Sequence, residues 1–280
     1  MILETPIPLG RQITPSKIYP SLDRVDYLAI NGDIDTLEEA FIRDNAQLEA
    51  MMVAEIDRQI DSNHTLRYIF GASLFRFYLA RWVRHADICI TVFGPQAARE
   101  LGVQFANSEV VRQGLIKLGV ILTSVQLQNL AQSVSKKAQN SPLVNGVLTA
   151  ASIALLKGVA RSQIGNGLKR TSRVVVATSL NNTREQVFID NSAVIERMVY
   201  NAILDGRTCP ICHRLNGMVL NFHDWLRTQW MAPIHDYCRC FWEAVKGTDT
   251  NKPRFTGPRI VPGFVQPPFT TFVERNGGSR

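Results

Sequence analysis

Four of the five cysteines in this 280-residue chain lie in one short stretch, from Cys209 to Cys240. Cys209 and Cys212 are separated by two residues, and His235 and Cys238 repeat that spacing further along. Two intervening residues let a tight turn aim both side chains at one ion, and structural zinc takes four nitrogen or sulfur ligands. A tight cluster with a nearby histidine indicates a metal site, whereas scattered pairs would indicate a disulfide framework.

The stretch offers one more candidate ligand than a tetrahedral zinc ion needs. The candidates are Cys209, Cys212, His235, Cys238 and Cys240. We expect Cys238 to be the fourth ligand of one structural Zn2+, with Cys240 as the alternative, and we expect His213 and His223 to be weaker candidates. The competing interpretation is that the thiols are reduced and buried, or paired as disulfides. Small sheets need an additional constraint to stay folded, and a metal ion supplies one.

The composition is that of an ordinary globular chain, with 45% hydrophobic and 20% charged residues. Disorder along the whole chain is therefore excluded. The first residues show no basic region followed by an apolar core, so we expect no signal peptide and folding in a reducing cytosol. Cys89 lies in an apolar stretch, residues 86–93, and is expected to be a buried, inert thiol.

Apolar residues recur at helical spacing through most of the first 190 positions. Helices are predicted from an N-cap at Asp35 or Thr36 to residue 60, and over residues 66–90, 95–101, 108–134, 143–168 and 173–191. The apolar stripe of 108–134 is interpreted as a core stripe rather than a coiled coil. A membrane span over 143–160 is disfavoured because the segment has only 18 residues and contains Asn145 and Lys157.

Alternation and turn residues predict three short strands after the helices, over residues 194–204, 218–222 and 240–245. The fold class is therefore mainly α with a small α+β zinc-binding C-terminal module, an extended N-terminal arm and an extended C-terminal tail. The predicted domains are the arm (1–33), a helical domain (34–170), the zinc module (171–246) and a Pro- and Gly-rich tail (247–280).

The formal net charge of +7 is unevenly distributed, because no Asp or Glu occurs from Val110 to Arg184. The basic residues of this stretch are Arg112, Lys117, Lys136, Lys137, Lys157, Arg161, Lys169, Arg170, Arg173 and Arg184. Such a face is suited to contact nucleic acid or an acidic protein. The alternative is a solvated surface whose counter-charges come from elsewhere in the fold.

The motif order resembles the head morphogenesis family typified by the phage Mu F protein and related minor head proteins. The matching segments are Asp205-Gly-Arg-Thr-Cys-Pro-Ile-Cys212, Leu215-Asn-Gly217 and Pro233-x-His235-x2-Cys238-Arg-Cys240. The resemblance covers residues 173–245. One departure is Asp236, where the family usually has proline, and it bears on the shape of the loop rather than on the ligand set.

The resemblance implies a non-enzymatic component of a tailed phage, made in the host bacterial cytoplasm and present in the virion head. Its implied partners are the portal or major capsid proteins. Packaged DNA is a further candidate partner, through residues 110–184, whereas a small-molecule substrate, an organic cofactor and a membrane are not expected.

Two other functions compete with this interpretation. A zinc-ribbon nucleic-acid binder is supported by the basic stretch, but acidic residues nearly balance the arginines around the cysteines. A zinc-braced nuclease of the His-Asn-His type would need a second metal-binding histidine on a following helix, and no histidine follows His235. Arg239, between two thiols, is expected either to hydrogen-bond a zinc thiolate or a neighbouring carbonyl, or to be a plain surface residue.

Overall fold

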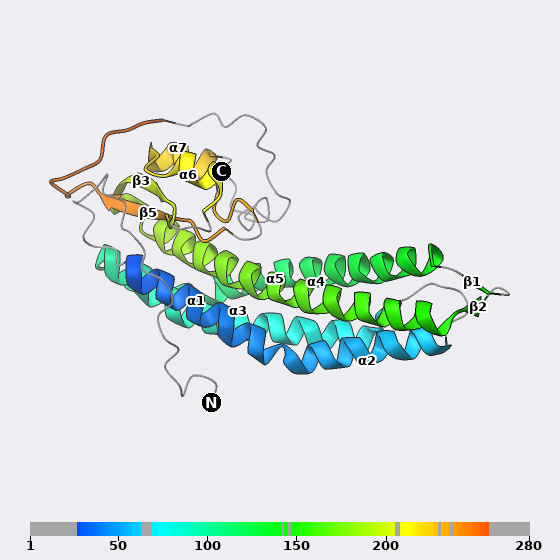
Figure 1. The fold of residues 1–280 in the computed structure, drawn as a ribbon. Coiled ribbons are helices and arrows are strands. Elements are labelled where there is room, and N and C mark those ends of the chain that lie inside the picture. Colours follow the sequence, from blue (N-terminus) through cyan, green and yellow to red (C-terminus); the bar gives the residue numbers. More distant parts are fainter. Residues whose placement is uncertain are drawn as a thin grey trace. The chain divides into compact units, whose positions relative to one another are not determined.

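The computed structural model describes residues 27–62, 69–141, 143–144, 147–204, 208–228, 231–235 and 238–257. Over these residues the chain is mainly helical and ends in a small three-stranded sheet, which confirms the predicted fold class (Figure 1). Most of the predicted arm (1–26) and most of the predicted tail (258–280) lie outside the described residues.

The helices are α1 (Tyr27–Asp44), α2 (Ala46–Ser62), α3 (Ala72–Leu101), α4 (Ser108–Gln139), α5 (Ala150–Asp190), α6 (Pro210–Leu215) and α7 (Phe222–Arg227). The strands are β1 (Leu143–Val144), β2 (Val147–Leu148), β3 (Ile195–Asn201), β4 (Val219–Asn221) and β5 (Phe241–Lys246). The strands β3, β4 and β5 confirm the three that alternation predicts. The short helices α6 and α7 were not predicted.

The single helix predicted up to residue 60 is divided at Asn45 into α1 and α2. The helix predicted from residue 66 is wrong at its start, since residues 69–71 are not helical and α3 begins at Ala72.

Two further predicted helix boundaries are wrong because buried apolar residues continue the helical spacing past them. The N-cap at Asp35 or Thr36 lies inside α1, which begins at Tyr27. Ile30, Ile34 and Leu37 are all buried and share one face of that helix. The break before Pro95 is also wrong, since α3 runs through it. Proline removes one backbone hydrogen bond, but buried residues on both sides of it keep the helix packed.

The prediction of two helices over 143–168 and 173–191 is also wrong. Residues 143–144 (β1) instead pair antiparallel with residues 147–148 (β2). The helix begins only at Ala150, and the Thr149 hydroxyl caps it by accepting the Ser152 N–H at 3.1 Å. From there α5 continues without a break to Asp190, because no proline or glycine separates Leu168 from Arg173.

The described chain divides into two compact units, and each is described by itself. Unit 1 comprises residues 1–40, 85–115 and 173–280, and unit 2 comprises residues 41–84 and 116–172. Helices α1, α3, α4 and α5 each contribute residues to both units.

Unit 2 is a packing of helices around a core of aliphatic side chains. Its buried core residues are Leu48, Met52, Ile56, Ile60, Leu74, Tyr78, Leu127, Val134, Ala138, Leu156, Ala160, Ile164 and Leu168. Gly119 of α4 lets the Trp82 ring of α3 approach, since a Cβ there would lie 2.2 Å from the ring. The Tyr78 hydroxyl hydrogen-bonds Gln126 at 2.6 Å and Thr171 at 2.5 Å, which ties α3 to α4 and α5.

The apolar stripe of α4 is only partly a core stripe. Leu118 and Leu127 are buried, as predicted, but Ile121 and Val125 are exposed, at 40% and 46%. Among the described helices, α4 is the one whose length and composition would allow it to cross a membrane. In its most apolar 18-residue segment, 33% is buried inside the protein.

Acidic partners from outside the basic stretch pair with at least five of its ten basic residues in the described part of the chain. The five ion pairs are Arg112–Asp87, Lys157–Asp61, Arg161–Asp57, Arg173–Glu38 and Arg184–Glu100. The alternative of counter-charges supplied elsewhere in the fold therefore holds for these five residues.

The sheet of unit 1 is antiparallel in the order β4-β3-β5. Met198 and Tyr200 of β3 face a large core that includes residues of α3, α5 and α6, while Val199 faces the opposite side. Both outer edges are covered. Asn181 of α5 donates to the Cys240 carbonyl at 3.0 Å beside β5, and Thr256 donates its N–H to the Val219 carbonyl at 3.0 Å beside β4.

Arg184 carries a buried charge that holds α3, α5 and β5 together. Its side chain is 1% exposed and binds both carboxylate oxygens of Glu100, at 2.8 and 2.5 Å. Its Nε donates to the Trp242 carbonyl at 3.2 Å. The guanidinium also lies 4.9 Å from the centre of the Phe241 ring. A desolvated cation with this many partners fixes the orientation of the sheet on α5.

We expect Glu100→Ala to lower the free energy of unfolding by about 3–5 kcal/mol, because it leaves the Arg184 charge buried without its carboxylate. The matched control is Asp61→Ala, which removes the partner of Lys157 at a half-exposed site (56% for Asp61) and should cost about 0–1 kcal/mol. Urea unfolding of both variants measures the difference. Equal losses for the two would contradict the role assigned to Arg184.

Candidate metal centre

The first pair of cysteines is positioned by the start of helix α6. Cys209 is the N-cap of α6, and its sulfur accepts the backbone N–H of Cys212 at 3.3 Å. Pro210 occupies the first helical position, where a missing N–H costs nothing. The Thr208 hydroxyl donates to the Ile203 carbonyl and closes the loop that leads into this turn. Two residues between the thiols therefore place both sulfurs at the helix N-terminus.

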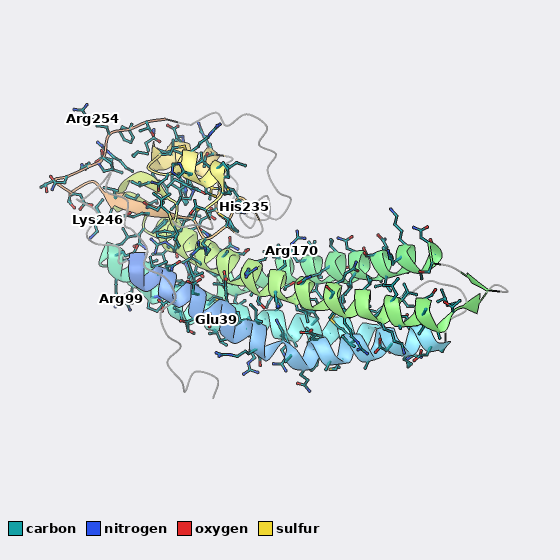
Figure 2. The ribbon with its side chains drawn as sticks, viewed as in Figure 1. Glu39, Arg99, Arg170, His235, Lys246 and Arg254 are labelled. Carbon is teal, nitrogen blue, oxygen red and sulfur yellow. The ribbon has the colours of Figure 1, made fainter. Side chains whose placement is uncertain are left out.

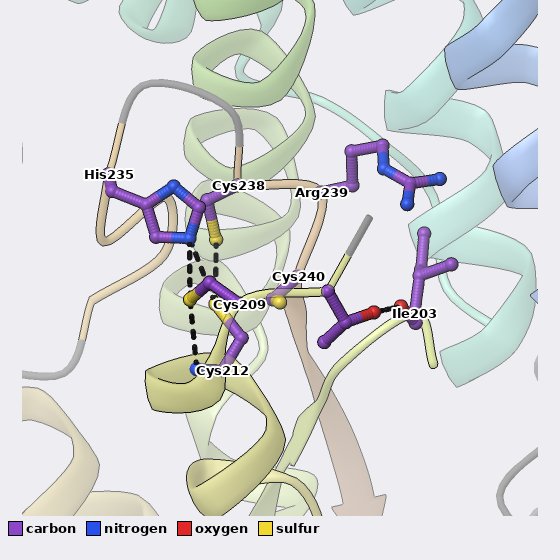
Figure 3. Close-up of a pocket in the computed structure, with 8 residues that line it drawn as sticks. Ile203, Cys209, Cys212, His235, Cys238, Arg239 and Cys240 are labelled. Atoms are coloured by element: carbon purple, nitrogen blue, oxygen red, sulfur yellow. Dashed lines mark hydrogen bonds between the residues drawn. The ribbon is translucent and has the colours of Figure 1, made fainter. Parts of the chain in front are cut away.

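The second pair, His235 and Cys238, lies in the chain segment before β5 (His235 is labelled in Figure 2). The His235 Nε2 atom lies 3.1 Å from Cys209 Sγ and 3.2 Å from Cys212 Sγ. Cys238 Sγ lies 3.8 Å from Cys212 Sγ. Figure 3 shows the imidazole pointing at the sulfurs of the first pair. The structure thus brings together the four residues that the spacing singles out.

Cys240 belongs to the same cluster. Cys212, Cys238 and Cys240 form one group with ligand atoms within 4.8 Å of one another, and Cys209, Cys212 and His235 form another. Cys212 is common to both groups. His213 and His223, the weaker candidates, are exposed and belong to neither group. Asp236, where the motif departs from the family pattern, lies outside the described residues.

Of the three buried thiols, Cys212 and Cys240 have a raised pKa, whereas hydrogen bonds from Cys212 and Cys240 lower the pKa of Cys238. Hydrogen bonds with Cys238 and Cys240, together with burial, raise the pKa of the Cys212 thiol. Burial also raises the pKa of the Tyr200 hydroxyl next to them, and the sulfurs of Cys238 and Cys240 add to that effect. A cation that binds these sulfurs must displace their protons, so its binding is coupled to proton release.

The cluster fits a metal ion by donor chemistry and by spacing. Thiolate sulfur and imidazole nitrogen are the ligands of structural zinc, and Zn–S bonds of about 2.3 Å in tetrahedral geometry place two sulfurs about 3.8 Å apart. Cys212 and Cys238 have that separation, 3.8 Å. The contacts of His235 with Cys209 and Cys212, at 3.1 and 3.2 Å, need to open by only a few tenths of an ångström.

Arg239 lies between two of the candidate ligands, but its side chain points away from the sulfurs (Figure 3). Its Nη1 donates to Asn31 Oδ1 of α1 at 2.8 Å, and Arg239 is buried. The prediction of a plain surface arginine is therefore wrong. Asn31 lies 208 residues away in the sequence, and no local pattern could have identified it as the partner. This hydrogen bond ties the metal-ligand loop to α1 within unit 1.

Tyr200 is the other residue of this site that sequence reasoning missed. Alternation predicts a strand over residues 194–204, but nothing in the sequence indicates that the Tyr200 hydroxyl reaches the sulfurs of Cys212 and Cys238, at 3.9 and 4.0 Å. The Cys89 thiol, by contrast, lies outside the cluster and is fully buried, as expected, and burial raises its pKa.

The fold and the cluster define a class: a mainly helical protein whose C-terminal part is a small α+β module with Cys and His side chains that could hold a metal ion. Residues 128–243 match the family model described as phage Mu protein F like protein. In this region the chain is similar to the phage Mu F-like family, which supports the resemblance that its motifs indicate. No curated protein and no solved structure matches the chain.

The family match begins at residue 128, upstream of the region in which the motifs are recognisable, and so includes part of α4 and nearly all of α5. The similarity suggests a phage head morphogenesis protein and is consistent with a non-enzymatic role.

Proposed function

We propose that the protein is a structural minor head protein of a tailed bacteriophage, which binds the portal or the inner capsid surface during head assembly. It would be made in the host cytoplasm and retained in the virion. The observation that carries this proposal is the family match over residues 128–243, which includes the segment with the Cys and His cluster. The module of residues 171–246 is proposed as the folding unit that the cluster stabilises.

We further propose that Cys209, Cys212, His235 and Cys238 bind one structural Zn2+. His235 contacts the sulfurs of the first pair directly, and Cys238 lies at the sulfur–sulfur separation that a tetrahedral ion requires. Cys240 remains the alternative fourth ligand, since it lies in one group with Cys212 and Cys238. Four protein ligands close the coordination sphere and leave no position for a reacting water, as expected of a structural site.

A structural role for the metal also follows from the size of the sheet. The strands β3, β4 and β5 have seven, three and six residues. A sheet this small is marginal in water without further constraint. An ion held by α6 and by the loop before β5 would connect the chain on both sides of β4, and its binding energy would add to the folding energy.

Contact with packaged DNA through residues 110–184 is supported less than the sequence suggests. Five of the ten basic residues in this stretch form ion pairs within the protein. The exposed residues Lys136, Lys137 and Lys169 are the proposed carriers of a nonspecific, salt-dependent contact.

The combined change Cys209→Ser and Cys212→Ser should abolish zinc binding and lower the thermal stability of the module, because it removes two of the four ligands. Zinc in the purified full-length chain is measured by elemental analysis, with about one ion per chain expected for the unmodified protein. The matched control is Cys89→Ala, a buried thiol outside the cluster, which should lose some stability and keep its zinc. Equal zinc content in the double variant and the unmodified protein would contradict the ligand assignment.

The head role is tested in phage particles. Heads purified on a density gradient should contain the full-length protein, detected by mass spectrometry, at a copy number far below that of the major capsid protein. Heads assembled with the Cys209→Ser and Cys212→Ser chain should contain at least about tenfold less, because a misfolded module cannot bind its assembly partner. Absence of the unmodified protein from purified heads would overturn the proposed role.

A further inference from the structure

The sulfurs of the cluster differ in the hydrogen-bond donors that reach them. The sulfur of Cys209 accepts the N–H of Cys212 at the start of α6. The sulfurs of Cys212 and Cys238 lie deeper, in side chains that are 1% exposed, and both are contacted by the hydroxyl of Tyr200, at 3.9 and 4.0 Å. The Tyr200 hydroxyl thus contacts two buried sulfurs that belong to different segments of the chain.

Tyr200 is held rigidly in this position. It lies in the central strand β3 and is 0% exposed. Its backbone exchanges two hydrogen bonds of 2.8 Å with the turn before β4, from Gly217 N–H and to the Met218 carbonyl. Its ring packs edge-on against Trp242 of β5, with the ring centres 5.2 Å apart. The direction of the hydroxyl is therefore fixed by the sheet and not by the metal ligands.

The charge of the proposed site explains why such a donor is needed. Three thiolates and one neutral imidazole around a divalent ion leave a net charge of −1, in a place where two of the sulfurs are removed from water. Burying an anion is costly unless hydrogen-bond donors surround it. A thiolate can only accept hydrogen bonds, so the Tyr200 hydroxyl must be the donor in these contacts.

We propose that Tyr200 is a positioning residue of the metal site: its hydroxyl donates to the Cys212 and Cys238 thiolates, stabilises their charge and orients them toward the ion. This inference rests on the proposed zinc site and adds a residue to it. Outer partners of this kind typically change metal affinity by about 10–100-fold when removed. The Tyr200 hydroxyl also hydrogen-bonds Cys240, so it does not decide between Cys238 and Cys240 as the fourth ligand.

The test is Tyr200→Phe in the full-length chain, which removes one oxygen atom and keeps the ring. Zinc affinity is measured by competition with a chromophoric chelator, and about 10–100-fold weaker binding is expected. The Co2+-substituted protein should in addition show a shifted thiolate-to-metal charge-transfer band, which a purely structural loss of stability would not produce. The matched control is Tyr78→Phe, a buried tyrosine of unit 2 whose hydroxyl bonds Gln126 and Thr171 and no sulfur.

The outcomes separate the two proposals. Weaker zinc binding and a shifted band in Tyr200→Phe, with neither in Tyr78→Phe, support the inference. Unchanged affinity and an unchanged band in Tyr200→Phe overturn it while the zinc site stands, and so do equal losses in both variants. If the unmodified chain binds neither Zn2+ nor Co2+, both the proposed zinc site and the proposed role of Tyr200 are contradicted.

Discussion

The contact between the Cys209–Cys212 turn and the His235–Cys238 loop is the interaction on which the C-terminal module depends. These segments lie 26 residues apart at Cys209 and His235, and between them the chain forms α6, β4 and α7. None of these elements exceeds six residues. Their own backbone hydrogen bonds and apolar burial give them little independent stability. Contacts between the sulfur and nitrogen atoms of these two segments hold the three short elements together next to β3.

The remaining buried polar groups of unit 1 connect this loop to the helices. Arg184 and Asn181 of α5 donate hydrogen bonds to the carbonyl groups of Trp242 and Cys240. Arg239, in the loop that contains the candidate ligands, donates a hydrogen bond to Asn31 of α1. Each contact is a buried hydrogen bond whose loss leaves a desolvated partner. These hydrogen bonds fix the orientation of the sheet against α1 and α5. A displacement of the candidate ligand residues would therefore also displace the groups that bond these helices.

The sequence was sufficient where the determining interactions are local, and insufficient where they are not. Cys209 and Cys212 could be paired because two intervening residues form one turn, and the strand that became β3 could be predicted from alternation. The helix boundaries failed at Pro95, because distant packing outweighed the local signal for a break. The Arg239–Asn31 hydrogen bond spans 208 residues, and no pattern along the chain encodes such a pairing. The sequence left open the role of the basic stretch for the same reason, since the acidic partners of five of its residues come from other helices.

X-ray absorption at the zinc edge of the purified full-length protein tests the central claim most directly, because it reports the atoms bound to the ion. A zinc ion bound by Cys209, Cys212, Cys238 and His235 should show a first shell of about three sulfurs near 2.3 Å and one nitrogen at about 2.0–2.1 Å. A first shell of four sulfurs would instead indicate that Cys240, and not His235, is a ligand of the ion. A shell of oxygen and nitrogen without sulfur, or a protein that holds no zinc at all, would contradict the account.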